Sequence, residues 1–528
     1  MALLGEISSG PRRLGRRLLA FAQGSIRAWS TKRRALWFGL GIAVIACCFR
    51  ASVIGDGVGY YSYLPSVVAH GSFDLGPVFD RFIAINTPVA RQFLEITLPN
   101  GLTADYKPIG AALLALPFYL ITHLLFVLLV PGHQDPDVGA EYQLAFTAAS
   151  LFYAVLTTVL LYRFVRSVFG RRPARLATVG VVLATPLVAY VLFGASYSHT
   201  FSVFTITAFA ILLYATRANR TPGQWFLAGL LGGLATVTHV QEALFLALVP
   251  AEAVWQVAHR AWSARRLTGY GLLAIGVALP IVPQLVVDQV IFQQWLPQPA
   301  PNIAFDFTHP HLLDLLVSTH HGWLSWSPLV AVALLGLPAV IRRLEWLGVG
   351  LLLVGIGEFW INASLSDWWG GNAFGARRMT DQSLLIGLGL AASCAWLIRR
   401  RLASLATALV AAGVLWTVLL LAQYYYVIRK DVGPPWGDFL LGQVQAVAFI
   451  PRLFIQGSVV REVAAGSWLL ALYTGLVIAA VVIVAVKLGL WNSRGINGRA
   501  DGDRPSPDSS GRRARNLAPV PSRSPATG

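Results

Sequence analysis

Residues 108–130 read PIGAALLALPFYLITHLLFVLLV, a run that contains no Asp, Glu, Lys or Arg. A stretch of about 20 predominantly apolar residues is long enough for an α-helix to cross the hydrocarbon core of a membrane. Similar blocks recur along the chain, which is 56% hydrophobic and 12% charged, whereas soluble domains carry about 25% charged residues. The sequence therefore predicts an all-α integral membrane protein, a polytopic helical bundle.

We expect about twelve membrane spans from the other apolar blocks, because each is close to the length that a crossing helix needs. The blocks are 36–54, 143–162, 174–194, 200–216, 225–239, 241–257, 269–291, 326–341, 345–364, 382–398, 404–424 and 466–488. They form a transmembrane domain over 36–488 that follows a basic N-terminal arm (1–35). The tail 489–528 is rich in Ser, Pro, Gly and Arg and is predicted to be disordered.

Arginine clusters indicate the side of the membrane that each connection faces. The proposed spans place five clusters on the same side as the N-terminal arm, within 163–175, 217–220, 260–266, 342–343 and 399–401. Cytoplasmic loops are rich in Lys and Arg, so we expect a multi-pass protein of the cell (inner or plasma) membrane with both termini in the cytoplasm. We interpret the formal net charge of +17 as this excess of cytoplasmic Lys and Arg, which faces anionic lipid, and not as a sign of nucleic-acid binding.

The block 108–130 is the exception to the crossing pattern. If it crossed, every later connection would change sides and the arginine clusters would lie outside the cell. We therefore expect this block to lie along the outer interface or to re-enter the membrane from the outside. The segment 55–142 then becomes a first extracytoplasmic loop with interfacial helices.

Three further outer segments follow from the same topology, at 292–325, 365–381 and 425–465. The pair 225–257 is too long for one span and is interrupted near His239, so we interpret it as two short helices that turn at the outer side.

The first outer loop carries a carboxylate and a lysine at its two membrane-proximal positions. It opens with Gly55-Asp56-Gly57-Val58-Gly59-Tyr60-Tyr61, in which Asp56 is a candidate general base or an ordinary interfacial aspartate in a turn. The run Asp105-Tyr106-Lys107-Pro108 places Lys107 at the level of lipid phosphates, where it binds an anion or marks the interface as a snorkelling lysine.

The segment 366–381 places two arginines on the outer side, against the pattern of all other clusters. Arg377 and Arg378 need an anionic partner, and a phosphate suits a bidentate guanidinium, although a salt bridge to Asp367 or Asp381 would also satisfy them. The preceding Trp368 and Trp369 could stack on a sugar ring or belong to an aromatic belt.

Histidines and one glutamate complete the candidate residues. The run 309–328 contains four histidines, His321 among them, but their spacing fits no standard metal-ligand set and no metal site is predicted. His199 lies near an outer helix end and is first interpreted as a core histidine. Glu242 lies at the interruption of the 225–257 pair, where an ionisable group is functional or caps the turn. The three cysteines indicate neither a disulfide nor a metal cluster.

Three short phrases resemble the GT-C superfamily of membrane glycosyltransferases, which includes protein O-mannosyltransferases and aminoarabinose transferases. They are YKPIG at 106–110, HGWLSWSP at 321–328 and WWGGNAFGAR at 368–377, and they also resemble uncharacterised bacterial members. The Asp after the first span and the interrupted helical pair fit the same superfamily. The resemblance covers roughly residues 36–425.

This resemblance implies a polyprenyl-phosphate sugar donor, an inverting transfer outside the cytoplasm and interfacial helices over the membrane. Asp56 matches the catalytic aspartate of the first loop, and Lys107 matches the lysine near the lipid phosphate. Many members carry a second acidic residue beside the first, whereas Gly57 stands here; Asp105 could compensate. Dependence on a divalent cation is therefore left open.

The predicted function is a hexosyltransferase that moves a sugar from a polyprenyl-phosphate donor to a glycan, lipid or protein acceptor, with Asp56 as base. Lys107, Arg377 and Arg378 are expected to bind the donor phosphate in contact with membrane lipids. Further candidates for substrate binding are Tyr60, Asp105, His199, Glu242, His321, Trp368 and Trp369. Two alternatives remain, a secondary transporter and a lipid-linked glycan polymerase or ligase.

Overall fold

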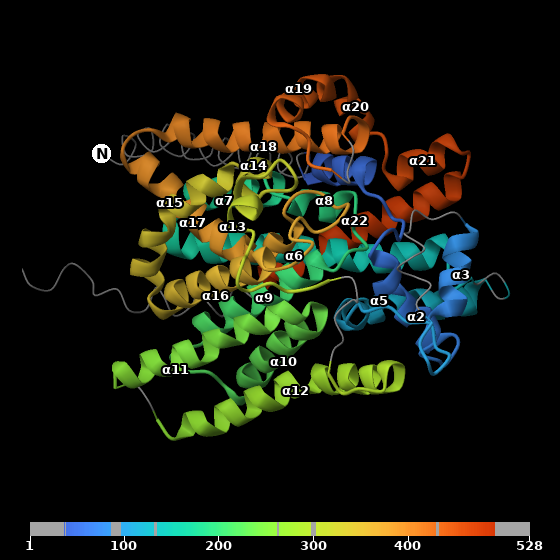
Figure 1. Cartoon of the computed structure of the whole chain (residues 1–528), viewed down its shortest axis with the longest axis horizontal. Coiled ribbons are helices and arrows are strands. Elements are labelled where there is room, and N and C mark those ends of the chain that lie inside the picture. The colour runs from blue at the N-terminus through green and yellow to red at the C-terminus, as the bar shows by residue number, and fades with distance from the viewer. Residues whose placement is uncertain are drawn as a thin grey trace, which may run out of the picture.

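The computed structural model describes residues 36–491 except 37, 86–96, 131, 133–134, 261–262, 297–302 and 429–431. The N-terminal arm and the predicted disordered tail lie outside these residues. Every regular element in the described part is a helix (Figure 1), and extended pairing is limited there to two isolated β-bridges. The prediction of an all-α polytopic membrane fold is confirmed.

An apolar helix, Phe38–Cys48, comes first and has no label in Figure 1. The labelled helices of the first half are α2 (Gly57–Val68), α3 (Gly76–Ala84), α5 (Gly110–Leu129), α6 (Ala140–Phe169), α7 (Arg171–Leu183), α8 (Leu187–Leu192), α9 (His199–Ala215), α10 (Pro222–Thr238), the 3₁₀ helix η1 (Val240–Ala247), α11 (Leu248–Ala258) and α12 (Arg265–Phe292). The second half contains α13 (Leu312–Val317), α14 (Trp323–Trp326), α15 (Leu329–Leu344), α16 (Trp346–Ala363), η2 (Arg377–Gln382), α17 (Ser383–Arg399), α18 (Ala403–Tyr426), α19 (Trp436–Ala446), η3 (Val447–Phe449), α20 (Ile450–Leu453), α21 (Ser458–Ala464) and α22 (Trp468–Trp491).

Eight helices in the described part are long and apolar enough to cross a membrane, or nine if a bent pair at Trp436–Leu453 and Ser458–Ala464 is counted as one span. Each apolar block proposed as a span overlaps a helix, but several of these helices are shorter than a full crossing. Phe38–Cys48 and α9 are examples. Part of the difference from about twelve expected spans arises because α9 and α10 are single helices of only 17 residues. The eight also include α5 (Gly110–Leu129), the block that was expected not to cross.

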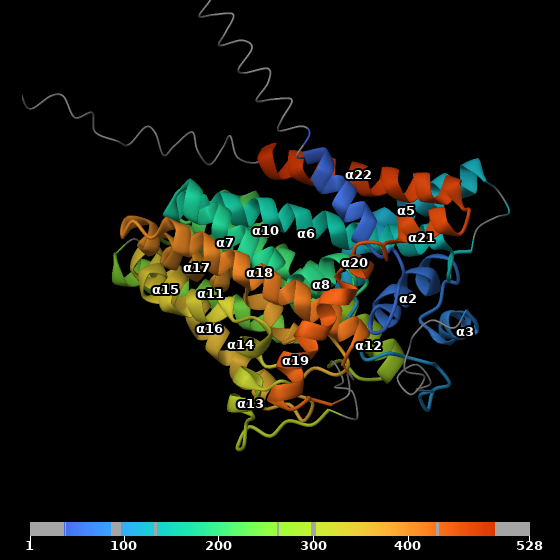
Figure 2. The same cartoon turned by 90° about the horizontal axis from the view of Figure 1, so that it is seen from above.

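Helix α5 forms the block 108–130 as one continuous helix with an apolar surface. It runs antiparallel to the first half of α6, because the Tyr153 hydroxyl donates to the Leu114 carbonyl (3.2 Å) while His123 Nδ1 lies 2.9 Å from the Tyr142 hydroxyl. The end of α5 therefore lies beside the start of α6 and away from the arginines that follow Phe169. Figure 2 shows α5 at one end of the bundle.

Asp56 lies at the same end of the bundle. The Val53 N–H donates to Gln143 Oε1 (2.8 Å) in the first turn of α6, and α3 reaches the residues that precede α6 through the Arg81–Asp135 ion pair (2.7 Å). These contacts place the end of α5 on the Asp56 side of the arginine-rich connections, whereas the start of α5 lies beside the middle of α6. The position of α5 relative to the membrane stays a prediction.

The mid-chain pair breaks where the sequence indicated. Helix α10 ends at Thr238, His239 is extended (φ −154°), and the chain continues into η1. Helix α10 packs closely on α12, since a Cβ at Gly229 would lie 2.0 Å from the Leu273 carbonyl oxygen; small residues allow such backbone approach between membrane helices. The break itself packs on the start of α5, where a Cβ at Gly110 would lie 2.4 Å from the Val237 carbonyl oxygen.

Two of the four apolar cores in the described residues position the site. The larger core packs α7, α9, α15, α16 and α17 against one another around buried side chains such as Leu347 and Leu388. The second packs α2 and α3 against α5 and α6, with the Tyr61 ring in edge contact with Phe82 (5.7 Å) and Phe146 (5.7 Å). The second core fixes the start of α2, which Asp56 directly precedes.

Candidate functional site

Asp56, Lys107 and Arg377 form one ion cluster, although they come from three separate segments. Arg377 Nη1 lies 2.6 Å from Asp56 Oδ2, and Lys107 Nζ lies 3.7 Å from the same oxygen. Asp56 and Lys107 keep about a third of their side-chain surface exposed (31% and 30%), whereas Arg377 keeps 14%. The structure thus brings together the predicted base and two of the three predicted phosphate ligands. Their catalytic roles stay predictions.

Glycines on both sides of Asp56 let its backbone approach the α8–α9 connection. Gly55 has a positive φ (+56°), and a Cβ there would lie 2.3 Å from the Tyr197 hydroxyl oxygen. A Cβ at Gly57 would lie 2.2 Å from Ser196 Oγ, which itself bonds the Ile54 backbone. Any larger residue would push Asp56 away from this wall, so the Gly-Asp-Gly sequence fixes its position.

Lys107 is positioned by the helix that follows Asp56. The Tyr63 hydroxyl donates to the Lys107 carbonyl (3.0 Å), and a Cβ at Gly59 would lie 1.7 Å from Asp105 Oδ2. On the other side, Gln284 Oε1 of α12 accepts from the Ile109 N–H (2.8 Å). The Asp105–Lys107 segment is therefore held between α2 and α12.

Arg377 begins η2 and is enclosed by the loop before it. Gly370 and Gly371 have positive φ values (+77° and +68°), and a Cβ at Gly370 would lie 3.3 Å from Arg377 Cγ. The guanidinium lies 5.9 Å from the centre of the Tyr197 ring. The glycines that appear in the sequence phrase before Arg377 thus make room for its side chain.

The cluster sets the protonation of its members. Burial raises the pKa of the Asp56 carboxyl, but Lys107 and then Arg377 outweigh it and hold this pKa well below its ordinary value. Burial lowers the pKa of Lys107, yet Asp56 and Asp105 raise it above the ordinary value, so the lysine stays charged. Burial raises the pKa of Asp105 to about 6, against the pull of Lys107.

Arg378 points to a different carboxylate. Its Nη2 lies 2.7 Å from Asp367 Oδ2, and its Nη1 donates to the Asp367 carbonyl (2.8 Å). This is the salt bridge that the sequence left open as an alternative to phosphate binding. Arg378 therefore belongs to the loop beside the ion cluster.

The aromatic residues near Arg377 pack on histidines. The Trp369 ring stacks on His320 (5.2 Å between centroids), and Trp368 stacks on His311 (5.9 Å). His321 Nδ1 lies 2.9 Å from the Trp369 carbonyl oxygen, and burial lowers the pKa of His321 to about 3, so a neutral ring donates this hydrogen bond. His321 thus fixes the tryptophan loop.

The remaining predicted residues lie around the cluster at different depths. Tyr60 follows Asp56 on α2, and its hydroxyl accepts from Ser198 Oγ (3.0 Å). His199 begins α9, and its ring packs on Tyr190 (4.4 Å between centroids). Glu242 is fully buried on η1, next to Asp381 and apart from Asp56.

Sequence reasoning missed the α8–α9 connection. Ser196 and Tyr197 form the wall against which Asp56 rests. The signal for them was a short polar run, Ala195-Ser196-Tyr197-Ser198, between two apolar blocks on the same side as Asp56. Asp381 was considered as a partner for the arginines, but it faces Glu242 instead.

A metal site does not emerge around the cluster. Within the described ranges, no three His, Cys, Asp or Glu side chains converge to hold a metal ion. Asp56 is flanked by two cations, whereas divalent cations such as Mg²⁺ and Ca²⁺ select sets of oxygen ligands. The residues present therefore do not fit such an ion.

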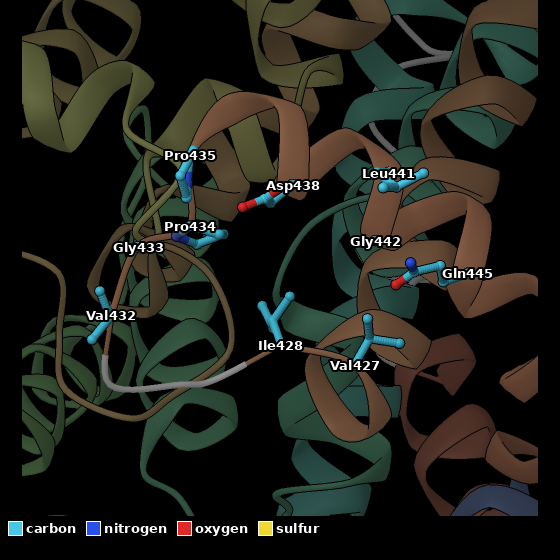
Figure 3. Close-up of a pocket in the computed structure, with 10 residues that line it drawn as sticks. All are labelled: Val427, Ile428, Val432, Gly433, Pro434, Pro435, Asp438, Leu441, Gly442 and Gln445. Atoms are coloured by element: carbon cyan, nitrogen blue, oxygen red, sulfur yellow. The ribbon is translucent and has the colours of Figure 1, made fainter.

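A groove of about 390 Å³ lies between the residues that follow α18 and helix α19 (Figure 3). Val427, Ile428, Val432 and Leu441 line it together with the single acidic side chain of Asp438. None of the predicted site residues lines this groove.

Comparisons with known proteins bear on the predicted family. Residues 138–286, under half of the chain, match the family model described as dolichyl-phosphate-mannose-protein mannosyltransferase. A search of curated proteins by sequence found no match. The family match confirms the resemblance to membrane glycosyltransferases that the sequence phrases indicated.

Solved structures that the chain matches at low identity include ArnT from Cupriavidus metallidurans. In the apo state it is 15% identical with a TM-score of 0.48, and bound to undecaprenyl phosphate it is 16% identical with a TM-score of 0.46; both comparisons cover 90% of this chain and 79% of ArnT. The oligosaccharyltransferase AglB from Archaeoglobus fulgidus, in complex with an inhibitory peptide and a dolichol-phosphate, is 13% identical with a TM-score of 0.40, over 79% of this chain and 56% of AglB.

Proposed function

We propose that this protein is a membrane glycosyltransferase that moves a sugar from a polyprenyl-phosphate donor to an acceptor on the extracytoplasmic side. The acceptor is a glycan, a lipid or a protein, and both termini of the enzyme lie in the cytoplasm. The observation that carries the proposal is the convergence of Lys107 and Arg377 on Asp56, residues that lie up to 321 positions apart. The match to a mannosyltransferase family model over 138–286 supports it.

The charges of the cluster suit a sugar phosphodiester. Lys107 and Arg377 carry two positive charges and Asp56 carries one negative charge, so the group has an excess of one positive charge while Asp105 is protonated, below a pH of about 6. A polyprenyl-phosphate sugar carries one negative charge on its phosphodiester and would neutralise this excess. A planar guanidinium binds phosphate oxygens in pairs, and a lysine adds a mobile point charge.

The low pKa of Asp56 implies an order of events. While Arg377 and Lys107 hold the carboxylate, it is a weak base for an acceptor hydroxyl. When the donor phosphate takes over these cations, Asp56 loses its partners and its proton affinity rises. Donor binding would therefore activate the base, and the empty enzyme would be protected from premature chemistry.

The transfer step then needs no further reactant. The acceptor oxygen attacks the anomeric carbon and forms the new C–O bond, its proton passes to Asp56, and the bond between this carbon and the phosphate oxygen breaks. The electron pair of that bond leaves with polyprenyl phosphate, whose growing charge Lys107 and Arg377 stabilise. Attack from the face opposite the leaving phosphate inverts the anomeric centre.

The residues around Asp56 do not fit a divalent cation, so no step is routed through one. Asp105 instead supplies the second carboxyl of the site at a distance from Asp56, in place of the acidic residue that Gly57 replaces. Because Asp105 lies against Gly59 and shares its segment with Lys107, it tunes the charge next to the phosphate-binding lysine.

The test uses the full chain in lipid nanodiscs with labelled polyprenyl-phosphate sugars, offered as separate hexose donors with and without a mixture of cell-envelope acceptors. Turnover releases polyprenyl phosphate, which is quantified by thin-layer chromatography, and the same protein in proteoliposomes is tested for uptake of the free sugars. We expect release in nanodiscs and no uptake. Uptake without release would identify a transporter and would remove the enzymatic proposal.

A further inference from the structure

Three buried carboxyl groups lie near the ion cluster but take no part in it. Glu242 on η1 and Glu358 on α16 are 0% exposed, and Asp381 on η2 is 2% exposed. Asp381 follows Arg377 by one helical turn on the same short helix. Ionisable groups inside a membrane domain are costly and are retained where they have a function.

Glu242 and Asp381 face each other within hydrogen-bond range. Neither of their side chains accepts a hydrogen bond from a donor group in the described chain. Glu358 does accept a hydrogen bond, because Gln382 Nε2 donates to its Oε2. Two carboxylates in such contact without a donor between them cannot both carry a charge in a buried setting.

The polar side chains around these carboxyl groups also lack hydrogen-bond donors. Asn362 and Gln382 are 0% and 1% exposed, and the oxygens of both side-chain amides also lack a donor in the described residues. The region therefore holds a surplus of acceptors contributed by three different helices. A proton on one carboxyl would supply the donor that the other groups leave out.

The nearby cations are engaged elsewhere. Arg377 pairs with Asp56 and Arg378 pairs with Asp367. Among the described residues, no Lys, Arg or His nitrogen lies within 4.0 Å of the three carboxyl groups. The other titratable side chains on the packed elements are His239 at the end of α10 and His199 on α9, whose Nδ1 lies 3.4 Å from Thr380 Oγ1.

We propose that Glu242 and Asp381 share one proton, and that the resulting carboxyl–carboxylate hydrogen bond is a positioning contact that fixes η2, and with it Arg377, against η1. The first part concerns the protein itself, whereas the effect on Arg377 rests on the proposed function. A shared proton converts two repelling charges into a short, charge-assisted hydrogen bond. The pair joins the mid-chain break to the helix that presents Arg377.

The contacts of η2 show how the effect reaches the site. Thr380 Oγ1 donates to the Arg377 carbonyl (2.5 Å), and Gln382 at the other end of η2 is bound to Glu358. Loss of the shared proton at high pH would place like charges on η1 and η2 and push them apart. Arg377 would then move relative to Asp56, so binding of a phosphate would weaken on the alkaline side.

The experiment compares Glu242→Gln, Asp381→Asn and Glu242→Ala with the wild-type chain in nanodiscs. Infrared spectra in H₂O and D₂O report a protonated carboxyl, and thermal unfolding reports stability. Binding of undecaprenyl phosphate between neutral and alkaline pH reports the position of Arg377. Lys107 stays charged over this pH range, because its pKa lies above the ordinary value, so it does not contribute to the change in binding.

We expect a protonated-carboxyl band in the wild type at neutral pH that is lost in Glu242→Gln and in Asp381→Asn. Both amide variants should unfold near the wild-type temperature and should lose less lipid binding than Glu242→Ala, because the amide keeps a donor. Binding to the wild type should fall at alkaline pH, and this fall should disappear in Glu242→Gln.

Glu252→Gln is the matched control. Glu252 is also fully buried, but it is ionised against Arg220 (2.9 Å) and Arg266 (3.6 Å), so its amide variant should unfold at a clearly lower temperature and should keep the infrared band. The proposal is overturned if the wild type has no such band, or if Glu242→Gln is as unstable as Glu252→Gln. If the band behaves as expected but the wild type binds no undecaprenyl phosphate, the proposed function fails while the shared proton stands.

Discussion

Replacing Asp56 by Asn should tighten binding of polyprenyl phosphate while it abolishes transfer. Without a donor, Asp56 forms ion pairs with the two cations that the donor phosphate needs, at 2.6 Å from Arg377 and 3.7 Å from Lys107. A neutral amide of the same shape leaves both cations without a competing anion. Because most substitutions in a binding site weaken ligand binding, an increase in affinity would be a specific sign of this arrangement.

The size of the effect follows from the contact that the phosphate must replace. A hydrogen bond between charged groups contributes about 1.5–3 kcal/mol, and each 1.4 kcal/mol changes a dissociation constant about tenfold. Asp56 is 31% exposed, so solvent screening favours the lower limit and an increase in affinity of about tenfold. Loss of the base should reduce single-turnover transfer by about 10²–10⁴-fold.

Undecaprenyl phosphate, titrated into nanodiscs that contain the full chain, gives the dissociation constant, and rapid-quench transfer gives the rate. Asp367→Asn is the control, because it frees Arg378 from an equally short pair (2.7 Å) without touching the cluster. Affinity should stay unchanged in this control; a gain there would assign Arg378 to the donor phosphate as well. Weaker binding by Asp56→Asn would refute the competition for Arg377 and Lys107, and near wild-type transfer would remove Asp56 as the base.

Four further outcomes are expected. Lys107→Ala should weaken undecaprenyl phosphate binding roughly tenfold in the same titration, because a charge-assisted contact is lost. Affinity for a polyprenyl-phosphate sugar, a monoanion, should fall as pH rises through about 6, where Asp105 becomes charged, and this dependence should vanish in Asp105→Asn. Gly59→Ala should displace the Lys107 segment, since its Cβ would lie 1.7 Å from Asp105 Oδ2; transfer assays and thermal unfolding should both show a loss, with an overpacking cost of about 1–3 kcal/mol. An epitope inserted after Gly132 should be accessible from outside intact cells, and cytosolic access would reverse the proposed orientation.

Much of the fold could be predicted from the sequence because membrane helices leave a strong local signal. Each apolar block overlaps a helix, and the break at Thr238–His239 appears where polar residues interrupt the 225–257 pair. The number of membrane crossings was harder to predict from the sequence. Phe38–Cys48 covers 11 of the 19 residues of its apolar block, 36–54. The residues after Cys48 turn to bring Asp56 to the α8–α9 connection, and hydropathy does not record such a turn.

The candidate site could be predicted residue by residue but not as an arrangement. Asp56, Lys107 and Arg377 each stand out against their neighbours, as a carboxylate between glycines, a lysine before a proline and an arginine on the outer side. Their pairing could not be foreseen, because the distance of 321 residues between Asp56 and Arg377 is closed by contacts of the Asp56 turn with the α8–α9 connection and by packing of α9 on η2. Tyr197 and Ser196 were missed for the same reason, since their importance comes only from contact with Gly55 and Gly57.

The ion pairs of the site differ in whether they join one segment or two distant segments. Arg377 and Arg378 are adjacent in the sequence, yet one holds Asp56, which lies in another segment, and the other holds Asp367 in its own loop. A local pair such as Arg378–Asp367 stabilises the loop, whereas a pair between distant segments can be exchanged for a ligand without unfolding either segment. Among the described residues, the carboxyl groups of Glu242 on η1 and Asp381 on η2 have no cation beside them. Lys107 and Arg377 keep 30% and 14% of their side-chain surface exposed, so a lipid phosphate can reach them. The proposed proton-sharing contact is buried and can hold Arg377 in place while its partner changes.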